Sequence, residues 1–449
     1  MTPQVKNEPA RGAPPTRGRV PAYAWYVLGM LTAMYTLSFI DRQILGFLVG
    51  PIKRDLQISD TRVAVLGGLA FGLFYTFLGL PIGRYVDRGN RRNLVSLGVL
   101  VWSLFTAACA GAGSFLTLFL ARMGVGVGEA SLGPSAYSMI TDYFPRERLG
   151  LALSIYYFGN IVGSSLAQIV GGSVIGAVSK TPLVTLPILG AVASWRMTFL
   201  VLGVPGLLFA LLALTMKEPV RKNLLPGANS LTVGQMLAQI KMRWQSVLGI
   251  AIGFVFQAAC NYGFMQWATA FFQRVHGWPL SRIGPSLGLV VLVFGCSGLY
   301  VGGVLCDRWL RKGMIEAPLR VCFPCAIGMG ILFPIAMTRA TGEQALAWIA
   351  GGLFFMAMPM GTAAAALQMI FPNQVRGQVT AMYLFVLNLG ALTLGPLVPA
   401  LLVDYGYRNE KMIGLALAWT ILGASVLMTL VVALTIKPYR RHYRAMHPA

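Results

Sequence analysis

The sequence predicts an all-α integral membrane protein whose twelve transmembrane helices form two six-helix pseudo-repeats. The first supporting observation is composition: of 449 residues, 56% are hydrophobic and only 11% are charged, whereas about a quarter of residues in soluble domains are charged. The second is a series of apolar runs of roughly 20 residues, each long enough to cross a ~30 Å hydrocarbon core. The third is a loop motif that occurs once in each half of the chain.

Hydropathy over windows of about 19 residues divides the chain into twelve spans. They are predicted at 22–50, 63–86, 93–113, 115–142, 150–177, 194–216, 246–273, 283–306, 319–338, 345–371, 378–402 and 410–436. Residues 178–193 are apolar but too short and too interrupted by proline to cross, so we expect an external loop that lies against the bundle.

These spans imply five parts. They are a disordered basic cytoplasmic tail (1–21), an N-terminal six-helix bundle (22–216), a cytoplasmic linker (217–245), a C-terminal six-helix bundle (246–436) and a second cytoplasmic tail (437–449).

The net charge of +22 follows the expected topology. Of the 36 Lys and Arg residues, 24 fall on one side of the predicted membrane and ten on the other. Because basic residues concentrate in cytoplasmic loops, we expect a plasma (inner) membrane protein with both termini in the cytoplasm. A nucleic-acid surface would need its basic residues on one soluble face, so no nucleic-acid partner is expected.

Enzyme and metal motifs are missing from the sequence. Cys322 and Cys325 have metal-like spacing, but they lie in a predicted span with no second pair and no histidine nearby, so no metal is expected. The chain contains no G-x-S-x-G, P-loop or H-E-x-x-H pattern. We therefore expect no catalytic residue and no cofactor, and an ion or solute gradient as the energy source.

The repeated loop motif follows the second and eighth spans. Residues 83–92 and 303–312 both read G-x3-D-R-x2-R-[RK], at an offset of 220 residues. Such repetition is typical of transporters built from two parallel repeats. The motif residues are Gly83, Asp87, Arg88, Arg91, Arg92, Gly303, Asp307, Arg308, Arg311 and Lys312.

These motifs resemble the cytoplasmic signature of the major facilitator superfamily. The resemblance implies that the motif residues act in gating, that the two halves rock in alternating access, and that the protein is a monomer. A narrower resemblance, to spinster-like transporters, rests on Asp41-Arg42, on residues 83–92 and on residues 122–131. It implies proton-linked transport of sphingosine phosphate, sphingolipids or lysophospholipids.

Four ionisable residues fall inside predicted spans: Asp41, Arg42, Arg122 and Glu129. A charge at this depth costs several kcal/mol, so it faces a partner or a wet cavity. At an offset of 227 residues, suggested by a weaker internal repeat, Arg122 and Glu129 correspond to the uncharged Ile349 and Met356. The charge chemistry is therefore expected in the N-terminal half alone.

These charges suggest a coupling mechanism. Glu129 in a low-dielectric cavity can exchange a proton near neutral pH, and Asp41 is a second candidate for proton coupling. Arg42 and Arg122 can hold an anionic head group, so protonation of Glu129 would release an arginine for substrate. Alternatively the four residues form static salt bridges, notably Asp41 with Arg122.

Further residues are predicted to line the substrate path: Tyr35, Phe158 and Asn160 in the first half, and Asn261 and Tyr262 in the second. The leading hypothesis is a proton-coupled carrier of an anionic amphipathic lipid across the bilayer. Two alternatives remain, a proton-coupled carrier of a small carboxylate and an uncoupled lipid scramblase. The sequence leaves the direction of transport open.

Overall fold

The computed structural model describes residues 20–447 except 87, 179–182, 187–189 and 222–232. Almost all of the tail predicted at 1–21, and Asp87 of the first motif, therefore lie outside the described residues. Within them, twelve helical segments are long and apolar enough to cross a membrane, which confirms the predicted number.

The first six spans include two long single helices and four that are shorter or broken. The helices are α1 (Ala22–Leu56), α2 (Asp60–Gly67) with α3 (Leu69–Val86), α4 (Arg91–Ala108) with the short η1 (Cys109–Gly111), α5 (Phe115–Glu129) with α6 (Leu132–Tyr143), α7 (Arg146–Val178) and α8 (Trp195–Ala213).

A linker helix, α9 (Val233–Met242), precedes the second set of spans. These are α10 (Trp244–His276), α11 (Leu280–Arg311), α12 (Ala317–Arg320) with α13 (Cys322–Met337), α14 (Gly342–Ala357) with α15 (Thr362–Ile370), α16 (Asn373–Leu401) with η2 (Leu402–Tyr407), and η3 (Glu410–Met412) with α17 (Ile413–Met446).

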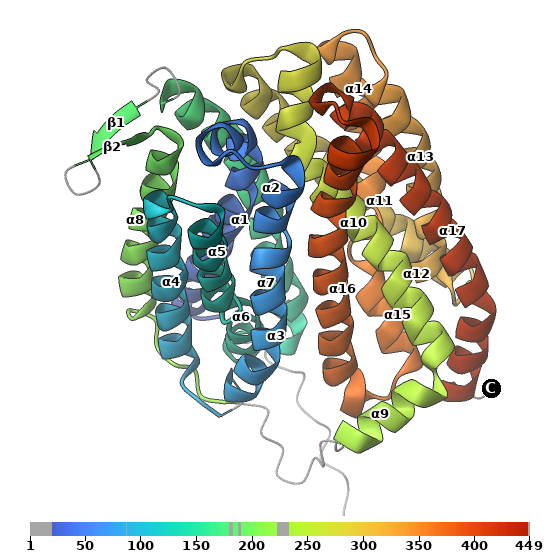
Figure 1. Cartoon of the computed structure of the whole chain (residues 1–449). Helices are drawn as coiled ribbons and strands as arrows, with labels where there is room; N and C mark the ends of the chain where they lie inside the picture. The colour runs from blue at the N-terminus through green and yellow to red at the C-terminus, as the bar shows by residue number, and fades with distance from the viewer. Residues whose placement is uncertain (1–19, 87, 179–182, 187–189, 222–232, 448–449) are drawn as a thin grey trace, which may run out of the picture.

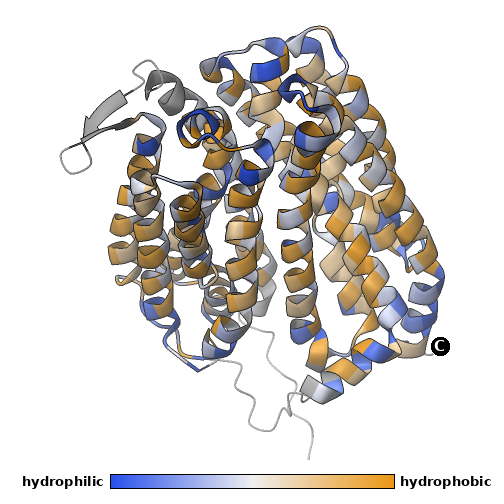
Figure 2. Ribbon diagram, in the orientation of Figure 1, coloured by the Kyte–Doolittle hydropathy of each residue, from blue (hydrophilic) through white to orange (hydrophobic). Residues whose placement is uncertain are grey.

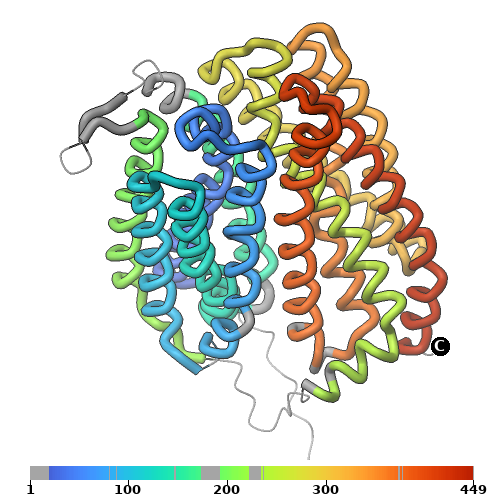
Figure 3. Tube along the Cα trace, viewed as in Figure 1, coloured from blue at the N-terminus to red at the C-terminus, as the bar shows by residue number. Residues whose placement is uncertain are grey.

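The two sets of spans stand side by side as two bundles (Figures 1 and 3). The start of α1, the linker helix and the end of α17 lie at one end of the molecule, here called the linker side. The opposite end is called the hairpin side. Hydrophobic residues dominate the middle of the helices and hydrophilic ones gather toward both ends, as expected for a membrane protein (Figure 2).

One predicted segment differs from the structure, and a second has a helical structure that was not predicted. Residues 178–193 were expected to form a loop against the bundle, but Leu183–Leu186 (β1) and Gly190–Ala193 (β2) pair as an antiparallel hairpin that projects from the bundle (Figure 1). The β-branched residues of this segment favour strands. The predicted tail at 437–449 is helical as far as Met446, because hydropathy detects the lipid-crossing part of a helix and not its polar extension.

Contacts between the bundles are closest where side chains are absent. The break between α2 and α3 lies at Gly68, where a Cβ atom would stand 2.1 Å from the carbonyl oxygen of Leu392 in α16. Gly172 of α7 and Gly284 of α11 face each other in the same way, with the Cα of each 2.7 Å from a Cβ built on the other. These glycines let helices of opposite halves meet backbone to backbone.

Candidate functional site

The four predicted charges lie in α1 and α5, inside the membrane-spanning part of the first bundle. Asp41 is 2% exposed, and Arg122 and Glu129 are each 1% exposed. Glycines on α5 bring its neighbours close: a Cβ at Gly126 would lie 2.5 Å from a backbone atom of α3, and one at Gly128 at 2.5 Å from α4. The charges are consequently enclosed by protein on several sides.

Arg42 and Glu129 form a buried ion pair between α1 and α5. The Nε of Arg42 lies 2.7 Å from Oε2 of Glu129, and the Ser38 hydroxyl donates to the same oxygen at 2.6 Å. The second carboxylate oxygen, Oε1, has no hydrogen-bond partner. Glu129 therefore binds Arg42 through Oε2, while Oε1 makes no hydrogen bond with a described residue.

An aromatic cage surrounds the guanidinium of Arg42. Its Cζ atom lies 4.9 Å from the ring centre of Phe39, 4.6 Å from that of Phe71 and 4.5 Å from that of Tyr75. Each ring face attracts a cation, by about 0.5–2 kcal/mol depending on desolvation. The cage can hold the positive charge of Arg42 even when its carboxylate partner is neutral.

Arg122 makes no side-chain hydrogen bond or ion pair with any residue that the structure describes. None of its three guanidinium nitrogens makes a hydrogen bond, although the residue is buried; its nearest aromatic contact is the Phe71 ring, 5.7 Å from Cζ. Asp41 accepts a hydrogen bond from the Thr106 hydroxyl at 2.9 Å, and its other oxygen is unpaired. The static Asp41–Arg122 salt bridge considered from the sequence is therefore not formed. A buried guanidinium without partners is strongly suited to receive an anion.

A small pocket connects Arg42 to the second bundle. It encloses about 20 Å³, room for about one water molecule. Gln266 of α10 also faces it and has an unpaired buried Nε2. The residues that line it are Arg42, Gln43, Gly67, Phe71, Tyr262, Gln266, Leu392 and Pro396. The pocket thus lies between the halves, where alternating access would expose a substrate site.

The residues predicted to line a path are only partly brought together. Tyr262 lines the pocket beside Arg42. Tyr35 stacks on Tyr156 at 4.5 Å and meets the edge of Phe39, a member of the Arg42 cage, at 5.1 Å.

The other predicted lining residues lie apart from the buried charges. Asn261 donates instead to the sulfur of Met356, 3.6 Å away in α14. No hydrogen bond or ring contact among the described residues joins Phe158, which is 48% exposed, or Asn160 to the buried charges. Their assignment as substrate-binding residues stays a prediction.

At the hairpin side, charged groups from the two halves interlock. Asp60 of α2 binds Lys53 at 2.6 Å and receives two hydrogen bonds from Arg274 of α10, at 2.6 and 2.9 Å. Glu410 binds Lys53 at 2.7 Å. The backbone N–H and the hydroxyl of Thr61 both donate to Asp404, at 2.7 and 2.6 Å. We call these six residues the hairpin-side lock, since they join the halves.

At the linker side, the ion pairs among the described residues stay within one half. In the first half, Arg91 donates to Asp142 at 2.5 Å and to Glu218 at 2.6 Å. In the second, Glu316 accepts from Arg320 at 2.8 Å and from Arg440. Among the described residues, the halves are therefore joined by ion pairs at the hairpin side and not at the linker side.

The predicted gating residues fall at this linker side. Arg91 is buried, and the backbone N–H of Arg92 donates to Glu218 at 2.9 Å. The other charged members that the structure describes make no ion pair with a described residue; they are Arg88, Asp307, Arg308, Arg311 and Lys312. The two glycines of the motifs, Gly83 and Gly303, have no side chain to form one. Their gating role stays a prediction, and Asp87 lies outside the described residues.

Sequence reasoning missed two groups. The first is the Arg42 cage and its polar neighbours, in particular Phe71, Tyr75, Ser38 and Thr106. Phe71 and Tyr75 are four residues apart, which places both on one helix face, but nothing in the sequence pairs that face with Arg42. The second is the hairpin-side lock, whose members come from segments far apart in the chain.

Comparisons with known proteins agree with this architecture. The model of the family described as Major Facilitator Superfamily matches residues 31–394. An "MFS-type efflux pump" of Mycolicibacterium smegmatis is 28% identical over 376 residues, covering 80% of this chain and 83% of the pump. A "probable L-galactonate transporter" of Escherichia coli is 25% identical, covering 73% of this chain and 71% of that protein.

One similar solved structure is that of a bacterial homologue of the human lysosomal transporter Spinster, in an inward-facing, unoccupied conformation. It superimposes with a TM-score of 0.79 at 25% identity and covers 96% of this chain and 100% of that chain. The match supports the spinster-like resemblance seen in the sequence.

Proposed function

Because this chain belongs to the Major Facilitator Superfamily, and is thus a multi-pass transporter, we propose that it is a proton-coupled carrier of an anionic amphipathic lipid. The substrate class is one with a negatively charged head group, such as a lysophospholipid or a sphingosine-phosphate-like lipid. The observation that carries the proposal is the buried guanidinium of Arg122, which makes no hydrogen bond with a described residue and shares the Phe71 ring with Arg42, itself paired with Glu129.

Coupling follows from competition for Arg42. While Glu129 is ionised, it holds Arg42 at 2.7 Å. A proton on Glu129 removes the attraction, and the aromatic cage keeps the guanidinium in place. An anionic head group can then bind Arg42 and Arg122 together. When the substrate leaves, Glu129 loses its proton and recovers Arg42, so one proton movement accompanies one change of partner.

Asp41 contributes to the net charge of the site that contains Arg42, Arg122 and Glu129. Its carboxylate hydrogen-bonds to Thr106 and not to either arginine. With Asp41 and Glu129 both ionised, the two acids balance Arg42 and Arg122, and protonation of either leaves a net positive site. A site of that charge attracts an anion.

The state of the molecule matches a substrate site open toward the linker side. The hairpin-side lock closes the opposite end. The linker side carries the excess of Lys and Arg, so we propose that it faces the cytoplasm and that the conformation is inward-facing. Rocking of the halves would break the lock and expose the Arg42 pocket to the other side.

A second candidate is a proton-coupled carrier of a small carboxylate. The similarity to a probable L-galactonate transporter favours it, as does the small volume of the Arg42 pocket, about 20 Å³. Both candidates use the same arginines and the same proton site. They differ in the part of the substrate that the charged site does not touch.

Reconstitution separates these candidates. The purified protein would be placed in phosphatidylcholine vesicles with an imposed pH gradient, and the movement of a fluorescent anionic lysophospholipid and of radiolabelled L-galactonate would be followed. Gradient-driven lysophospholipid movement, lost in Arg122→Gln, supports the proposal. Gradient-driven movement of the carboxylate alone supports the second candidate. Lysophospholipid redistribution that ignores the gradient would show an uncoupled scramblase and overturn the coupling.

A further inference from the structure

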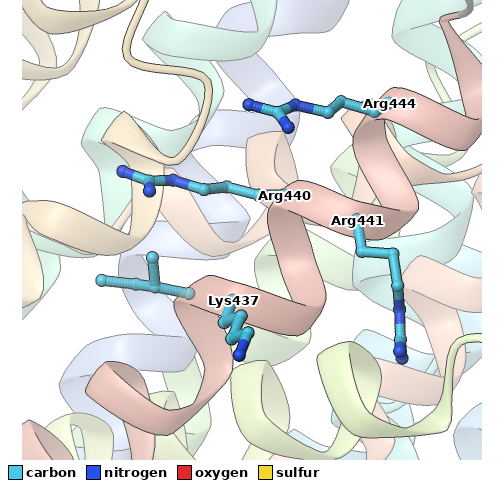
Figure 4. Close-up of a pocket in the computed structure, with 5 residues that line it drawn as sticks. Lys437, Arg440, Arg441 and Arg444 are labelled. Atoms are coloured by element: carbon cyan, nitrogen blue, oxygen red, sulfur yellow. The ribbon is translucent and has the colours of Figure 1, made fainter.

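A basic pocket lies on the last helix, outside the site described above. It encloses about 600 Å³ and is lined by Ile436, Lys437, Arg440, Arg441 and Arg444 of α17. The four cations are spaced at i, i+3, i+4 and i+7, so they share one broad helix face. In Figure 4, Arg440 and Arg444 extend to the same side of the helix, and Lys437 and Arg441 project from the turns beside them. No residue of this pocket lines the Arg42 pocket.

The position of this pocket along α17 corresponds to the edge of a bilayer. Leu430 and Leu434, on the preceding turns, are 55% and 77% exposed, as expected for leucines that face lipid chains. Lys437 follows Leu434 by three residues, hence by about 4.5 Å along the axis. Cations that begin one turn beyond an exposed apolar face stand at the level of lipid head groups.

The charge in the pocket is not neutralised by the protein. Glu316 accepts hydrogen bonds from both Arg440 and Arg320, so one carboxylate serves two guanidinium groups. Arg441 donates to the neutral side chain of Gln245 at 2.7 Å. Lys437 and Arg444 make no side-chain hydrogen bond or ion pair with any described residue. The pocket therefore keeps an excess of positive charge and several free donors.

We propose that this pocket binds the head group of an anionic phospholipid from the leaflet on the linker side. Lys437, Arg441 and Arg444 would contact the phosphate, and Ile436 would lie at the glyceride end of the lipid. Several donors on one side of a helix suit the oxygens of a phosphate, and basic pockets at this depth are the kind that lipid head groups occupy. The site is a lipid-binding site in its own right, distinct from the transport path.

The test uses the full-length protein in an uncharged detergent. The dissociation constant of fluorescent phosphatidylglycerol is measured for the native chain and for the triple variant Lys437→Gln, Arg441→Gln, Arg444→Gln, which leaves Arg440 with Glu316. A matched control, Arg54→Gln, Arg408→Gln, Lys411→Gln, removes three exposed cations at the hairpin side. Each basic residue near a lipid phosphate contributes roughly a fivefold change in binding, so the pocket variant is expected to bind about 100-fold more weakly and the control about equally to the native chain.

Two outcomes overturn the proposal: equal binding by the pocket variant and the native chain, or equal weakening by both variants, which would indicate a general charge effect. Inorganic phosphate added as competitor separates the lipid from a free anion. If millimolar phosphate displaces the lipid completely, the pocket is a free-anion site and the proposal fails.

Equal thermal midpoints of the variants would show that folding is intact. A pH-driven transport assay in pure phosphatidylcholine keeps the result independent of the proposed function. The pocket variant should transport there as the native chain does.

Discussion

The two halves of this protein have the same arrangement of six spans, but they distribute charge differently. At the centre of the first half, Arg42 pairs with Glu129 and Arg122 stands unpaired. The positions that correspond to Arg122 and Glu129 in the second half are Ile349 and Met356, both fully buried and apolar. Met356 receives hydrogen bonds from Gln257 and Asn261, so this region is packed and not charged. The first half thus has buried charges at its centre, and the second half has apolar side chains at the corresponding positions.

The ion pairs at the linker side also differ between the two halves. In the first half Arg91 forms ion pairs with two acids, Asp142 and Glu218. In the second a single acid, Glu316, holds two cations, Arg320 and Arg440. Each half thus has a group of ion pairs at the linker side, here called its clamp, with a cation at the centre of the first and an acid at the centre of the second.

The largest expected effect tests the central difference between the halves. Glu129→Gln cannot ionise, so Arg42 no longer exchanges partners with a proton. Without this exchange the proposed coupling step is lost, so gradient-driven transport should fall at least about 100-fold, equivalent to about 2.8 kcal/mol. The matched control in the second half, Met356→Leu, should change it less than about twofold. Transport in vesicles with imposed pH gradients measures both, and an unchanged pH dependence in Glu129→Gln would remove Glu129 from the coupling mechanism.

The second largest expected effect is on the hairpin-side lock, which joins the two halves. Asp60→Asn removes the ionised partner of Arg274 across the interface, and of Lys53 within the first half, which should weaken hairpin-side closure by about 3 kcal/mol. Spin labels at Gln57 and Tyr405, one in each half, should then report a longer distance. Asp55→Asn is the control, because Asp55 binds Arg196 within the first half. Equal distances in the two variants would show that the lock does not hold the halves together.

A smaller effect is expected from the clamp of the second half. Hydrogen bonding from Arg440 lowers the pKa of Glu316, which lies in the loop before α12, to about 2. A carboxyl with a lowered pKa stabilises the folded state above its ordinary range, near pH 4.3, and this contribution is lost as the pH falls toward 2.

The arginine side chains of this clamp are 38% and 43% exposed, so screening limits the contribution of Glu316 to about 1 kcal/mol or less. Glu316→Gln should lower the thermal midpoint at pH 7 and flatten its dependence on pH between about 2 and 4.3, the window set by the lowered and the ordinary pKa of this carboxyl. Glu343→Gln, in an exposed pair with Arg282, should leave the midpoint nearly unchanged. If the two variants melt alike at pH 7, the clamp adds nothing to stability.

The smallest expected effect compares two residues of the proposed substrate path, Tyr75 in the first half and Asn261 in the second. Tyr75→Leu removes one ring of the Arg42 cage and should weaken apparent substrate affinity about threefold to fivefold, since a cation–ring contact is worth about 0.5–1 kcal/mol. Asn261→Leu, in the second half, should change it less than about twofold. Concentration dependence of gradient-driven transport measures both, and a larger loss in Asn261→Leu would place the substrate against the second half.

Much of this protein is determined by local sequence. The number of spans follows from hydropathy because a lipid-crossing helix needs a continuous apolar run. The burial of Asp41, Arg122 and Glu129 follows from their position inside those runs. The repeated motif predicted two related halves. The extension of α17 to Met446 and the hairpin at Leu183–Ala193 escaped prediction, since neither depends on apolar length.

Partners were decided only by tertiary structure. The sequence left open which arginine Glu129 would hold and considered a pair of Asp41 with Arg122, but packing brought Arg42 to Glu129 and left Arg122 without a hydrogen bond to a described residue. Likewise Phe71 and Tyr75 become a cage, and Asp60 meets Arg274, through helix contacts between residues far apart in the chain. Periodicity places a side chain on a face of its own helix. Only the packing of helices decides which other face it meets, and in this protein that choice separates a paired arginine from a free one.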